Sequence, residues 1–320
     1  MEFFAGVCHP RERLDLMKEA GVQWLRADAP FPFEKETGNP SKSFKNYAEK
    51  ISQWSKAGFK VMGITPYPRG WKLEAGKPGS QDFLEIYEEA CRYLASELKD
   101  TVQGWQISNE LNLEMFRRPL TEAQAIEYAK YGGSGVKKGS PSALVGVNMA
   151  GFSDSALRMY AKLYPEDDKK EQVEFNYVGT DGYFGSWSSG GPDSWHEKLK
   201  ILYEKIRKPI IIQEFGYASA GEVMTPEERN SGKSPHELKK WAYDWRDGHT
   251  PEVQAEYLGE TYKIFKETPT VLGAIWYCWA DQDRCWNCGA VDCPCETAWG
   301  LVDIDENPKP AYYVYKHILG

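Results

Sequence analysis

Two glutamates each follow a short apolar run, a pattern that suits a pair of catalytic carboxyl groups. Glu110 ends a run that starts at residue 104, and Glu214 ends a run that starts at residue 210. Cleavage of a glycosidic bond requires such a pair, because one carboxyl group protonates the leaving oxygen while the other, ionised, attacks carbon or activates water. The two positions are far apart in the sequence, so this chemistry depends on a fold that brings both strand ends to one face.

Glutamates at strand ends also have a simpler interpretation. Among 47 acidic residues, any single one can cap a strand or pair with an arginine at the rim. Two local features favour the catalytic interpretation, since Asn109 directly precedes Glu110 and Gly216 lies two residues after Glu214. The two glutamates are therefore treated as one candidate pair.

Four cysteines fall within eleven residues near the end of the chain: Cys285, Cys288, Cys293 and Cys295. Four thiolates with no histidine among them match a closed, tetrahedral structural zinc site. Two disulfides are the alternative, and they would have to cross between the two halves of the cluster because Cys293 and Cys295 are too close for an easy bond to each other. Either arrangement predicts that the cysteine cluster cross-links a loop at about 280–300 and has no catalytic role.

Histidines are too few and too scattered for a metal-dependent hydrolase. The chain has five, with no His-x-His and no His-Glu-x-x-His pattern, so no cofactor is expected for catalysis. His9 follows the first candidate strand and is expected at the rim, where it is a candidate for sugar binding.

Short apolar, β-branched runs alternate with amphipathic segments along the whole chain. The candidate strands are residues 3–7, 22–26, 60–65, 104–108, 144–148, 177–181, 209–213 and 272–277. The candidate helices are residues 11–20, 46–57, 83–98, 122–132, 155–163, 195–206 and 251–267. This alternation predicts the α/β class and a (β/α)8 TIM barrel, formed as a single catalytic domain over residues 1–320.

An open, doubly wound sheet is the competing architecture. It usually carries a glycine-rich phosphate turn after its first strand, whereas residues 8–11 of this chain contain no Gly-x-Gly. The longer insertions follow candidate strands, at residues 66–82, 182–194, 215–250 and 280–300. In a barrel these insertions lie at the face that carries the chemistry.

Composition excludes several classes of partner. The net charge is −8, from 39 Lys and Arg against 47 Asp and Glu, and no basic run could follow a phosphate backbone, so nucleic acid is not expected. No stretch approaches the roughly 20 apolar residues of a membrane span. The sequence predicts a soluble protein, expected as a monomer, and leaves its compartment open because a leader removed before secretion would leave no trace.

With these residues at strand ends, the sequence resembles the clan A glycoside hydrolases, the retaining (β/α)8 families that include cellulases, β-mannanases and β-galactosidases. The resemblance covers nearly the whole chain. It implies that Glu110, after Asn109, is the acid/base and that Asn109 donates a hydrogen bond to the sugar 2-hydroxyl. It further implies that Glu214 is the nucleophile and that Arg26 helps to keep it ionised.

Further sugar-contacting residues follow from the same resemblance. It implies that Tyr183 hydrogen-bonds the nucleophile and that Trp276 forms the floor of the subsite where cleavage occurs, with Trp279 as the alternative if side-chain alternation favours it. Many clan members have His-x-Tyr after the sixth strand, whereas here the tripeptide at residues 181–183 starts with Asp181. The sugar contact of that histidine is therefore expected either to be absent or to be replaced by Asp181.

The expected substrate is a β-linked polysaccharide or oligosaccharide. Loop tryptophans at 71, 187 and 286 are candidate sugar platforms, which would favour endo action on a polymer. Residues 178–184 and 213–219 look most like β-mannanase-type members, so β-mannan is expected first and β-glucan second. An exo-acting β-glycosidase, such as a β-mannosidase or β-galactosidase, is an alternative. A non-catalytic carbohydrate-binding barrel is another, but it would not need both carboxyl groups.

Overall fold

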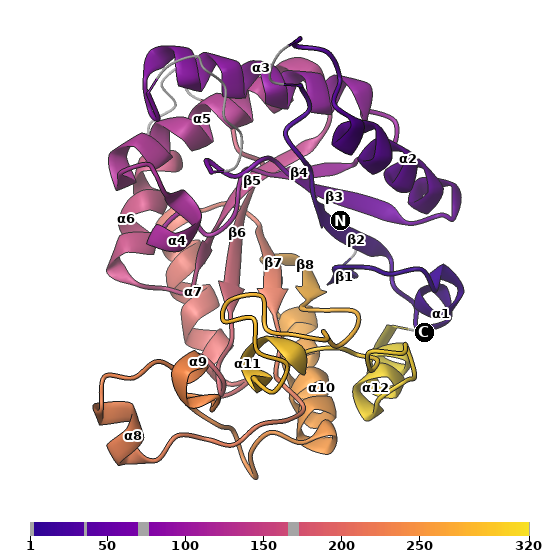
Figure 1. The fold of residues 1–320 in the computed structure, drawn as a ribbon, viewed down its shortest axis with the longest axis vertical. Helices are drawn as coiled ribbons and strands as arrows, with labels where there is room; N and C mark the ends of the chain where they lie inside the picture. The colour runs from indigo at the N-terminus through magenta and orange to yellow at the C-terminus, as the bar shows by residue number, and fades with distance from the viewer. Residues whose placement is uncertain (1–2, 35–36, 70–76, 166–172, 320) are drawn as a thin grey trace. The chain divides into compact units, whose positions relative to one another are not determined.

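The computed structural model describes residues 3–34, 37–69, 77–165 and 173–319 of the 320-residue chain. Eight strands follow one another in chain order around a closed barrel (Figure 1). They are β1 Phe4–Cys8, β2 Trp24–Asp28, β3 Lys60–Ile64, β4 Gly104–Gln106, β5 Leu144–Ala150, β6 Tyr177–Gly182, β7 Ile210–Phe215 and β8 Val271–Trp276. Helices alternate with these strands, so the predicted (β/α)8 TIM barrel is confirmed.

The strand ends differ from the predicted ones by at most two residues. The second strand shows why such differences arise. Val22, expected in the strand, donates its backbone N–H to Met17 O, and the strand starts only at Trp24. The preceding helix therefore holds the first apolar residue of the run in its closing turn.

Seven helices alternate with the strands: α1 Leu14–Glu19, α2 Lys42–Lys56, α3 Gln81–Glu97, α5 Glu122–Gly139, α6 Asp154–Leu163, α7 Ser194–Ile206 and α10 Pro251–Glu267. Gly21 and Gly58 follow the caps of α1 and α2 with φ of 80° and 89°, the left-handed conformation that ends a helix at little cost. Within the described ranges, no helix is both long and apolar enough to cross a membrane.

Short helices lie in the loops that follow strands β4, β7 and β8. They are α4 Glu114–Arg117, α8 Pro226–Asn230, α9 Pro235–Leu238 and α11 Pro294–Thr297, and α12 Pro310–Leu319 ends the chain. The predicted insertion at 215–250 contains α8 and α9, and the predicted insertion at 280–300 contains α11. These loops supply much of the candidate site described below.

Helix α5 continues seven residues beyond its predicted end at residue 132. The glycines that suggested an end instead allow α3 and α5 to pack closely, as Figure 1 shows. A Cβ atom at Gly135 would lie 2.2 Å from Glu88 O, and one at Gly139 would lie 2.2 Å from Arg92 O. Both positions therefore require glycine because of helix packing.

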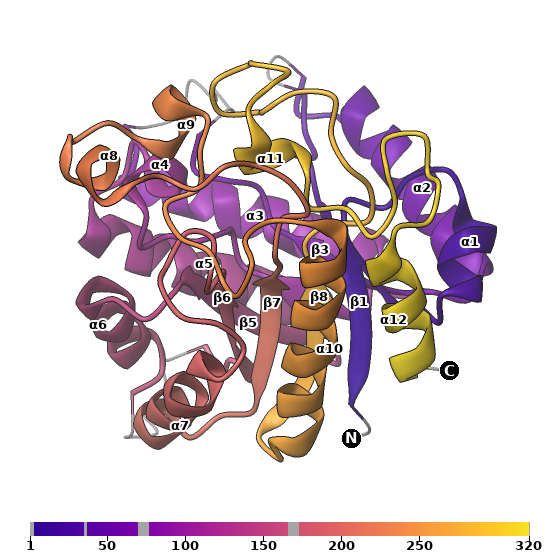
Figure 2. The same ribbon diagram turned by 90° about the horizontal axis from the view of Figure 1, so that it is seen from below.

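The chain groups into two compact units, and each is described by itself. The first unit comprises Met1–Gln23, Gly182–Lys200 and Glu214–Gly320, and the second comprises Trp24–Asp181 and Ile201–Gln213. In the first unit β1 pairs in parallel with β8, and α10 packs against both β8 and α12 (Figure 2). In the second unit β2 to β6 form consecutive parallel pairs.

Candidate active site

Glu110 lies in a tight turn just beyond β4. It is 8% exposed, and its backbone N–H donates to Asn148 Oδ1 at 3.0 Å. Ser108 and Glu110 both adopt left-handed backbone conformations, with φ of 54° and 43°. Such a conformation in a non-glycine residue costs about 1 to 3 kcal/mol, and it persists where the surroundings fix it, often at functional sites.

The side-chain amide of Asn148 links this turn to the ends of β4 and β6 through four hydrogen-bonded groups. Its Oδ1 accepts from Gln106 Nε2 at 2.8 Å as well as from the Glu110 backbone. Its Nδ2 donates to Asn109 Oδ1 at 3.0 Å and to Asp181 Oδ2 at 2.5 Å. Sequence reasoning missed Asn148, although a fully buried amide within the apolar run of β5 is a signal that could have revealed it.

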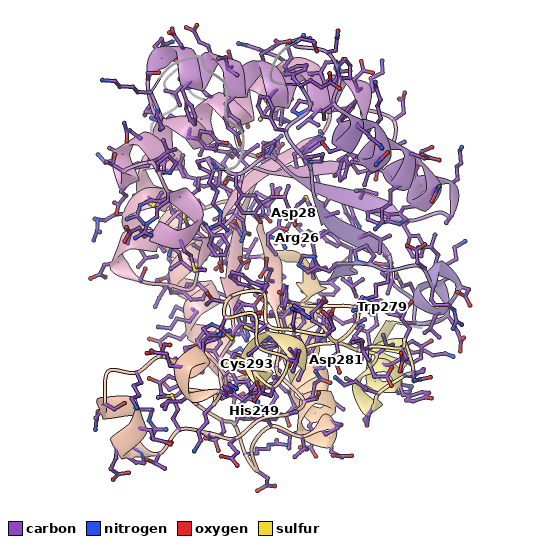
Figure 3. All side chains as sticks on the ribbon, viewed as in Figure 1. Arg26, Asp28, His249, Trp279, Asp281 and Cys293 are labelled. Carbon is purple, nitrogen blue, oxygen red and sulfur yellow. The ribbon has the colours of Figure 1, made fainter. Side chains whose placement is uncertain are left out.

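Arg26 fixes the orientation of Asn109 from β2 (Figure 3). Its Nη2 donates to Asn109 Oδ1 at 2.8 Å, and its Nε donates to Gln106 Oε1 at 2.9 Å. Asn109 Oδ1 thus accepts three hydrogen bonds, from Arg26, Gln106 and Asn148. Because this oxygen already accepts three hydrogen bonds, the amide nitrogen Nδ2 is the atom of Asn109 that can donate a hydrogen bond to a ligand.

Asp181 brings a second carboxyl group to this turn. It is fully buried at the end of β6, and one of its oxygens lies within 4.8 Å of a carboxylate oxygen of Glu110. The second unit therefore presents Glu110, Asn109 and Asp181 together at the carboxyl ends of β4 and β6, held by buried amides.

Glu214 occupies the penultimate position of β7 in the first unit and is 8% exposed. Tyr183, which directly follows β6, donates its hydroxyl to Glu214 Oε2 at 2.5 Å. This is the contact that the family resemblance implies for a nucleophile.

An aromatic wall adjoins Tyr183. The ring of Tyr277 packs edge-on against Tyr183 at 6.0 Å between centroids, and Trp299 does so at 5.0 Å. The exposed His9 packs edge-on against Tyr277 at 5.4 Å, which places it at the rim as expected. Tyr277 and Trp299 were not predicted from the sequence.

The two tryptophans expected to form a subsite floor are both buried. Trp276 is fully buried, packs on Phe215 and donates its indole N–H to Trp299 O. Trp279, labelled in Figure 3, is also fully buried and donates to Glu306 Oε1 at 2.8 Å. Tyr277, the residue after Trp276, contacts Tyr183.

Glu296 on α11 is a second buried carboxyl group of the first unit, and sequence reasoning missed it. Burial raises its pKa to about 8, and the negative charge of Glu214 adds to this rise. The side chains of Trp286 and Tyr277 hydrogen-bond to it. No periodic pattern marks this loop in the sequence, so only the fold reveals that Glu296 belongs near Glu214.

The predicted cysteine cluster forms only in part. Cys285, Cys288 and Cys293 gather with His236, and their ligand atoms all lie within 4.8 Å of one another. Cys295 points to Lys240 O at 3.6 Å. All seven cysteines are free thiols in the structure.

The candidate sugar platforms lie in different surroundings. Trp286 is 50% exposed, whereas Trp187 packs against the rings of His236 and Trp241. Trp71 lies outside the described residues. Of the two platforms that can be described, Trp286 has the larger surface free to meet a ligand.

No family model and no curated protein matches this sequence. Solved structures do match it over nearly its whole length. A family 39 glycoside hydrolase from Bacteroides cellulosilyticus WH2 has 17% identity and a TM-score of 0.69, and the match covers 99% of this chain and 63% of that one. A family 1 β-glucosidase from Thermotoga maritima has 13% identity and a TM-score of 0.67, covering 95% and 84%.

The GH53 catalytic domain from Ignisphaera aggregans has 19% identity and a TM-score of 0.64, covering 100% of this chain and 91% of that one. This chain therefore spans 63% to 91% of the length of these three proteins. At such identities the likeness establishes the fold alone, and the residues of the site must carry the argument for function.

Proposed function

We propose that this chain is a retaining glycoside hydrolase, with Glu214 as the nucleophile and Glu110 as the acid/base. The observation that most supports this is the burial of both carboxyl groups, each 8% exposed, at the carboxyl ends of β7 and β4. In (β/α)8 barrels, catalytic residues come from this end of the strands. The names of the similar solved structures, a family 39 glycoside hydrolase and a family 1 β-glucosidase, agree with this class.

The proposed reaction has two steps. Glu214 attacks the anomeric carbon while Glu110 protonates the leaving glycosidic oxygen, which gives a covalent glycosyl-enzyme. Glu110 then removes a proton from water, which attacks the same carbon and releases Glu214 with net retention. This mechanism requires the carboxyl groups to lie about 5 to 5.5 Å apart in the working enzyme, and no cofactor takes part in it.

Five other residues are proposed to position the substrate. Asn109 donates its free Nδ2 to the sugar 2-hydroxyl, and Arg26 keeps that amide oriented. Tyr183 holds Glu214, Asp181 replaces the histidine that many clan members carry, and His9 contacts a sugar at the rim.

Tyr277, rather than Trp276 or Trp279, is proposed to form the aromatic floor of the subsite where cleavage occurs. It lies between Tyr183 and His9 and hydrogen-bonds to Glu296, whereas both tryptophans are used in packing.

The substrate is proposed to be a β-linked glycan, with endo action on β-mannan first and β-glucan second. An exo-acting β-glycosidase, such as a β-mannosidase or β-galactosidase, is the second candidate, since one similar solved structure is a β-glucosidase. A non-catalytic sugar-binding barrel is the remaining alternative. We further propose that the chain acts as a single-domain, soluble monomer without nucleic-acid or membrane partners, secreted if a leader is removed.

Product analysis tests the assignment directly. The protein is incubated with β-mannan, β-glucan, xylan and galactan polymers and oligosaccharides, with Glu110→Ala and Glu214→Ala alongside. Internal fragments from one polymer, absent with both variants, would support the proposal and fix the mode of action. Full activity of Glu214→Ala would overturn it, and monosaccharide release from chain ends would select the exo alternative.

An activated substrate separates the two proposed roles. An aryl β-glycoside whose leaving group needs no proton should still glycosylate Glu214 in Glu110→Ala, giving a burst of product before slow hydrolysis. Glu214→Ala should show no burst with the same substrate. A burst from Glu214→Ala, with none from Glu110→Ala, would reverse the assignment.

The loop that contains Cys285, Cys288, Cys293 and Cys295 is proposed to hold a structural zinc ion. Three of these thiols gather in one place with His236, which is a familiar set of zinc ligands. The ion would stabilise the loop and take no part in the reaction.

A further inference from the structure

We propose that the ligands of this zinc ion are His236, Cys285, Cys288 and Cys293, and that Cys295 is not one of them. The ion would then join the loop after β7, which carries His236, to the loop after β8, which carries the cysteines. This ligand set deepens the zinc part of the proposed function and is independent of the catalytic assignment. Figures 1 and 2 both show α9, which carries His236, next to the loop with α11.

The distances fit tetrahedral zinc. With Zn–S of about 2.3 Å and Zn–N of about 2.05 Å, a tetrahedron has S···N edges of about 3.6 Å and S···S edges of about 3.8 Å. His236 Nδ1 lies 3.4 Å from Cys285 Sγ and 3.7 Å from Cys293 Sγ. All four ligand atoms, including Cys288 Sγ, lie within 4.8 Å of one another. These separations match ligands around one ion, and the three cysteines are free thiols.

Backbone N–H groups turn towards the sulfurs. The N–H of Cys288 donates to Cys285 Sγ at 3.5 Å, and the N–H of Asn287 also hydrogen-bonds this sulfur. The N–H of Ala290 hydrogen-bonds the sulfur of Cys288. Such donors fix the orientation of the sulfurs.

Cys295 lies beside the cluster but outside the set of four. Its sulfur donates to the backbone oxygen of Lys240 at 3.6 Å and also hydrogen-bonds the side chain of Cys293, and the residue is fully buried within α11. It is not one of the four residues whose ligand atoms all lie within 4.8 Å of one another. His236 supplies the fourth ligand instead, which completes a Cys3His set and leaves no open position for water. A closed site of this kind predicts structural zinc rather than a catalytic ion.

The metal site would brace aromatic residues that adjoin Tyr183. The ring of His236 packs against Trp187 at 5.4 Å, and Trp187 packs against Trp241 at 5.2 Å. Trp241 packs against Trp299, which in turn packs against Tyr183, with 5.0 Å between centroids in both cases. Cys293 is also the N-cap of α11, the helix that carries Glu296 (Figure 3). Loss of the ion would therefore loosen residues beside Glu214.

Metal content tests the ligand set in four versions of the full chain: wild type, His236→Ala, Cys293→Ser and Cys295→Ser. After dialysis against metal-free buffer, zinc per chain is measured by mass spectrometry, and zinc release to a colorimetric chelator is timed. We expect one zinc per wild-type chain and per Cys295→Ser chain. In the other two variants, release should be faster by about tenfold or more. Cys295→Ser is the matched control, because it removes a buried thiol of the same loop.

Two results would overturn the proposal. One is zinc retained by His236→Ala but lost from Cys295→Ser, which would establish the four-cysteine site. The other is a wild-type chain without zinc and with fewer than seven free thiols after denaturation, which would establish disulfides. If the variants fail to fold, X-ray absorption at the zinc edge of the wild type decides, since three sulfurs and one nitrogen support the proposal and four sulfurs contradict it.

Discussion

The two units hold their candidate catalytic carboxyl groups in different ways. In the second unit, Glu110 is held by the buried amide of Asn148, which lies within a strand of the barrel. In the first unit, Glu214 receives the hydroxyl of Tyr183, and aromatic rings from the loops surround that tyrosine. One carboxyl group thus depends on hydrogen-bonded amides, and the other on one hydroxyl group and packed rings.

The amides of the second unit fix the orientation of a carboxyl group, whereas the rings of the first unit shape the surface around one. Amides whose donors and acceptors are all used fix a group in one geometry, and removing one leaves buried polar atoms without partners. Packed rings define a surface and tolerate replacement by a ring of similar size. Variants of the amide network should therefore damage turnover more than variants of the aromatic wall.

The largest effect is expected from Asn148→Ala. The change leaves the Glu110 N–H, Asn109 Oδ1 and Asp181 Oδ2 without a shared partner, so the turn that carries Glu110 should shift. We expect kcat to fall by about 10²- to 10³-fold, since small misplacements of catalytic groups are this costly. We expect the free energy of unfolding to fall by about 3 kcal/mol. Steady-state kinetics and urea denaturation measure the two effects.

Asn176→Ala is the matched control for this variant. Asn176 is also an amide between β5 and β6, but it hydrogen-bonds Val145 N near the amino ends of the strands. The Asn176→Ala variant should be less stable without a comparable loss of kcat, because in this fold residues at the amino ends of the strands support stability. Equal losses of kcat in the two variants would mean that the Asn148 network acts on stability alone.

Tyr183→Phe should have a smaller effect. It removes the hydroxyl donated to Glu214 but keeps the ring that packs on Tyr277 and Trp299. Hydrogen bonds to charged groups contribute about 1.5 to 3 kcal/mol, so we expect kcat/KM to fall by about 10- to 100-fold. Thermal unfolding should change little. A large loss of stability with unchanged kcat/KM would assign Tyr183 to packing rather than to Glu214.

Glu296→Gln tests the buried carboxyl group of α11 through the pH dependence of stability. Because burial raises the pKa of Glu296 to about 8, the folded state keeps this proton at pH 6 to 7, where the unfolded state has lost it. The wild-type free energy of unfolding should therefore fall as pH rises, by about 1 kcal/mol between pH 6 and 7 from this group.

The glutamine variant should lack this contribution, because its amide does not titrate in that range. At pH 6 its turnover should stay within about threefold of the wild type, since a neutral amide resembles a protonated carboxyl group. Urea denaturation at several pH values compares the two proteins. Identical pH dependence in both would show that Glu296 is already ionised at pH 6.

The sequence predicted the strands and helices, because their apolar residues recur at a regular spacing. Apolar runs placed all eight strands within two residues, and strand ends pointed to Glu110 and Glu214. The end of α5 was placed too early because its glycines serve packing against α3, which the sequence does not reveal. A polar residue inside an apolar run marks Asn148 as unusual but does not identify its partners.

Residues from irregular loops could not be predicted. Glu296 and His236 lie in loops after β8 and β7, where neither alternation nor helical spacing relates position to direction. The choice between Trp276 and Trp279 depends on which of the two side chains faces inward, and a shift of one residue reverses every side chain of a strand.

Trp279→Phe should have the smallest effect on turnover. Trp279 is fully buried, donates to Glu306 and packs on Tyr312, so the variant should lose about 2 kcal/mol of stability through a cavity and one lost hydrogen bond. If Tyr277 forms the aromatic floor, KM and kcat should stay within about twofold of the wild type, because Trp279 then makes no substrate contact. A rise of KM with unchanged kcat would instead mean that Trp279 binds sugar directly. The aromatic residues of the first unit would then include one, Trp279, that serves both packing and substrate binding.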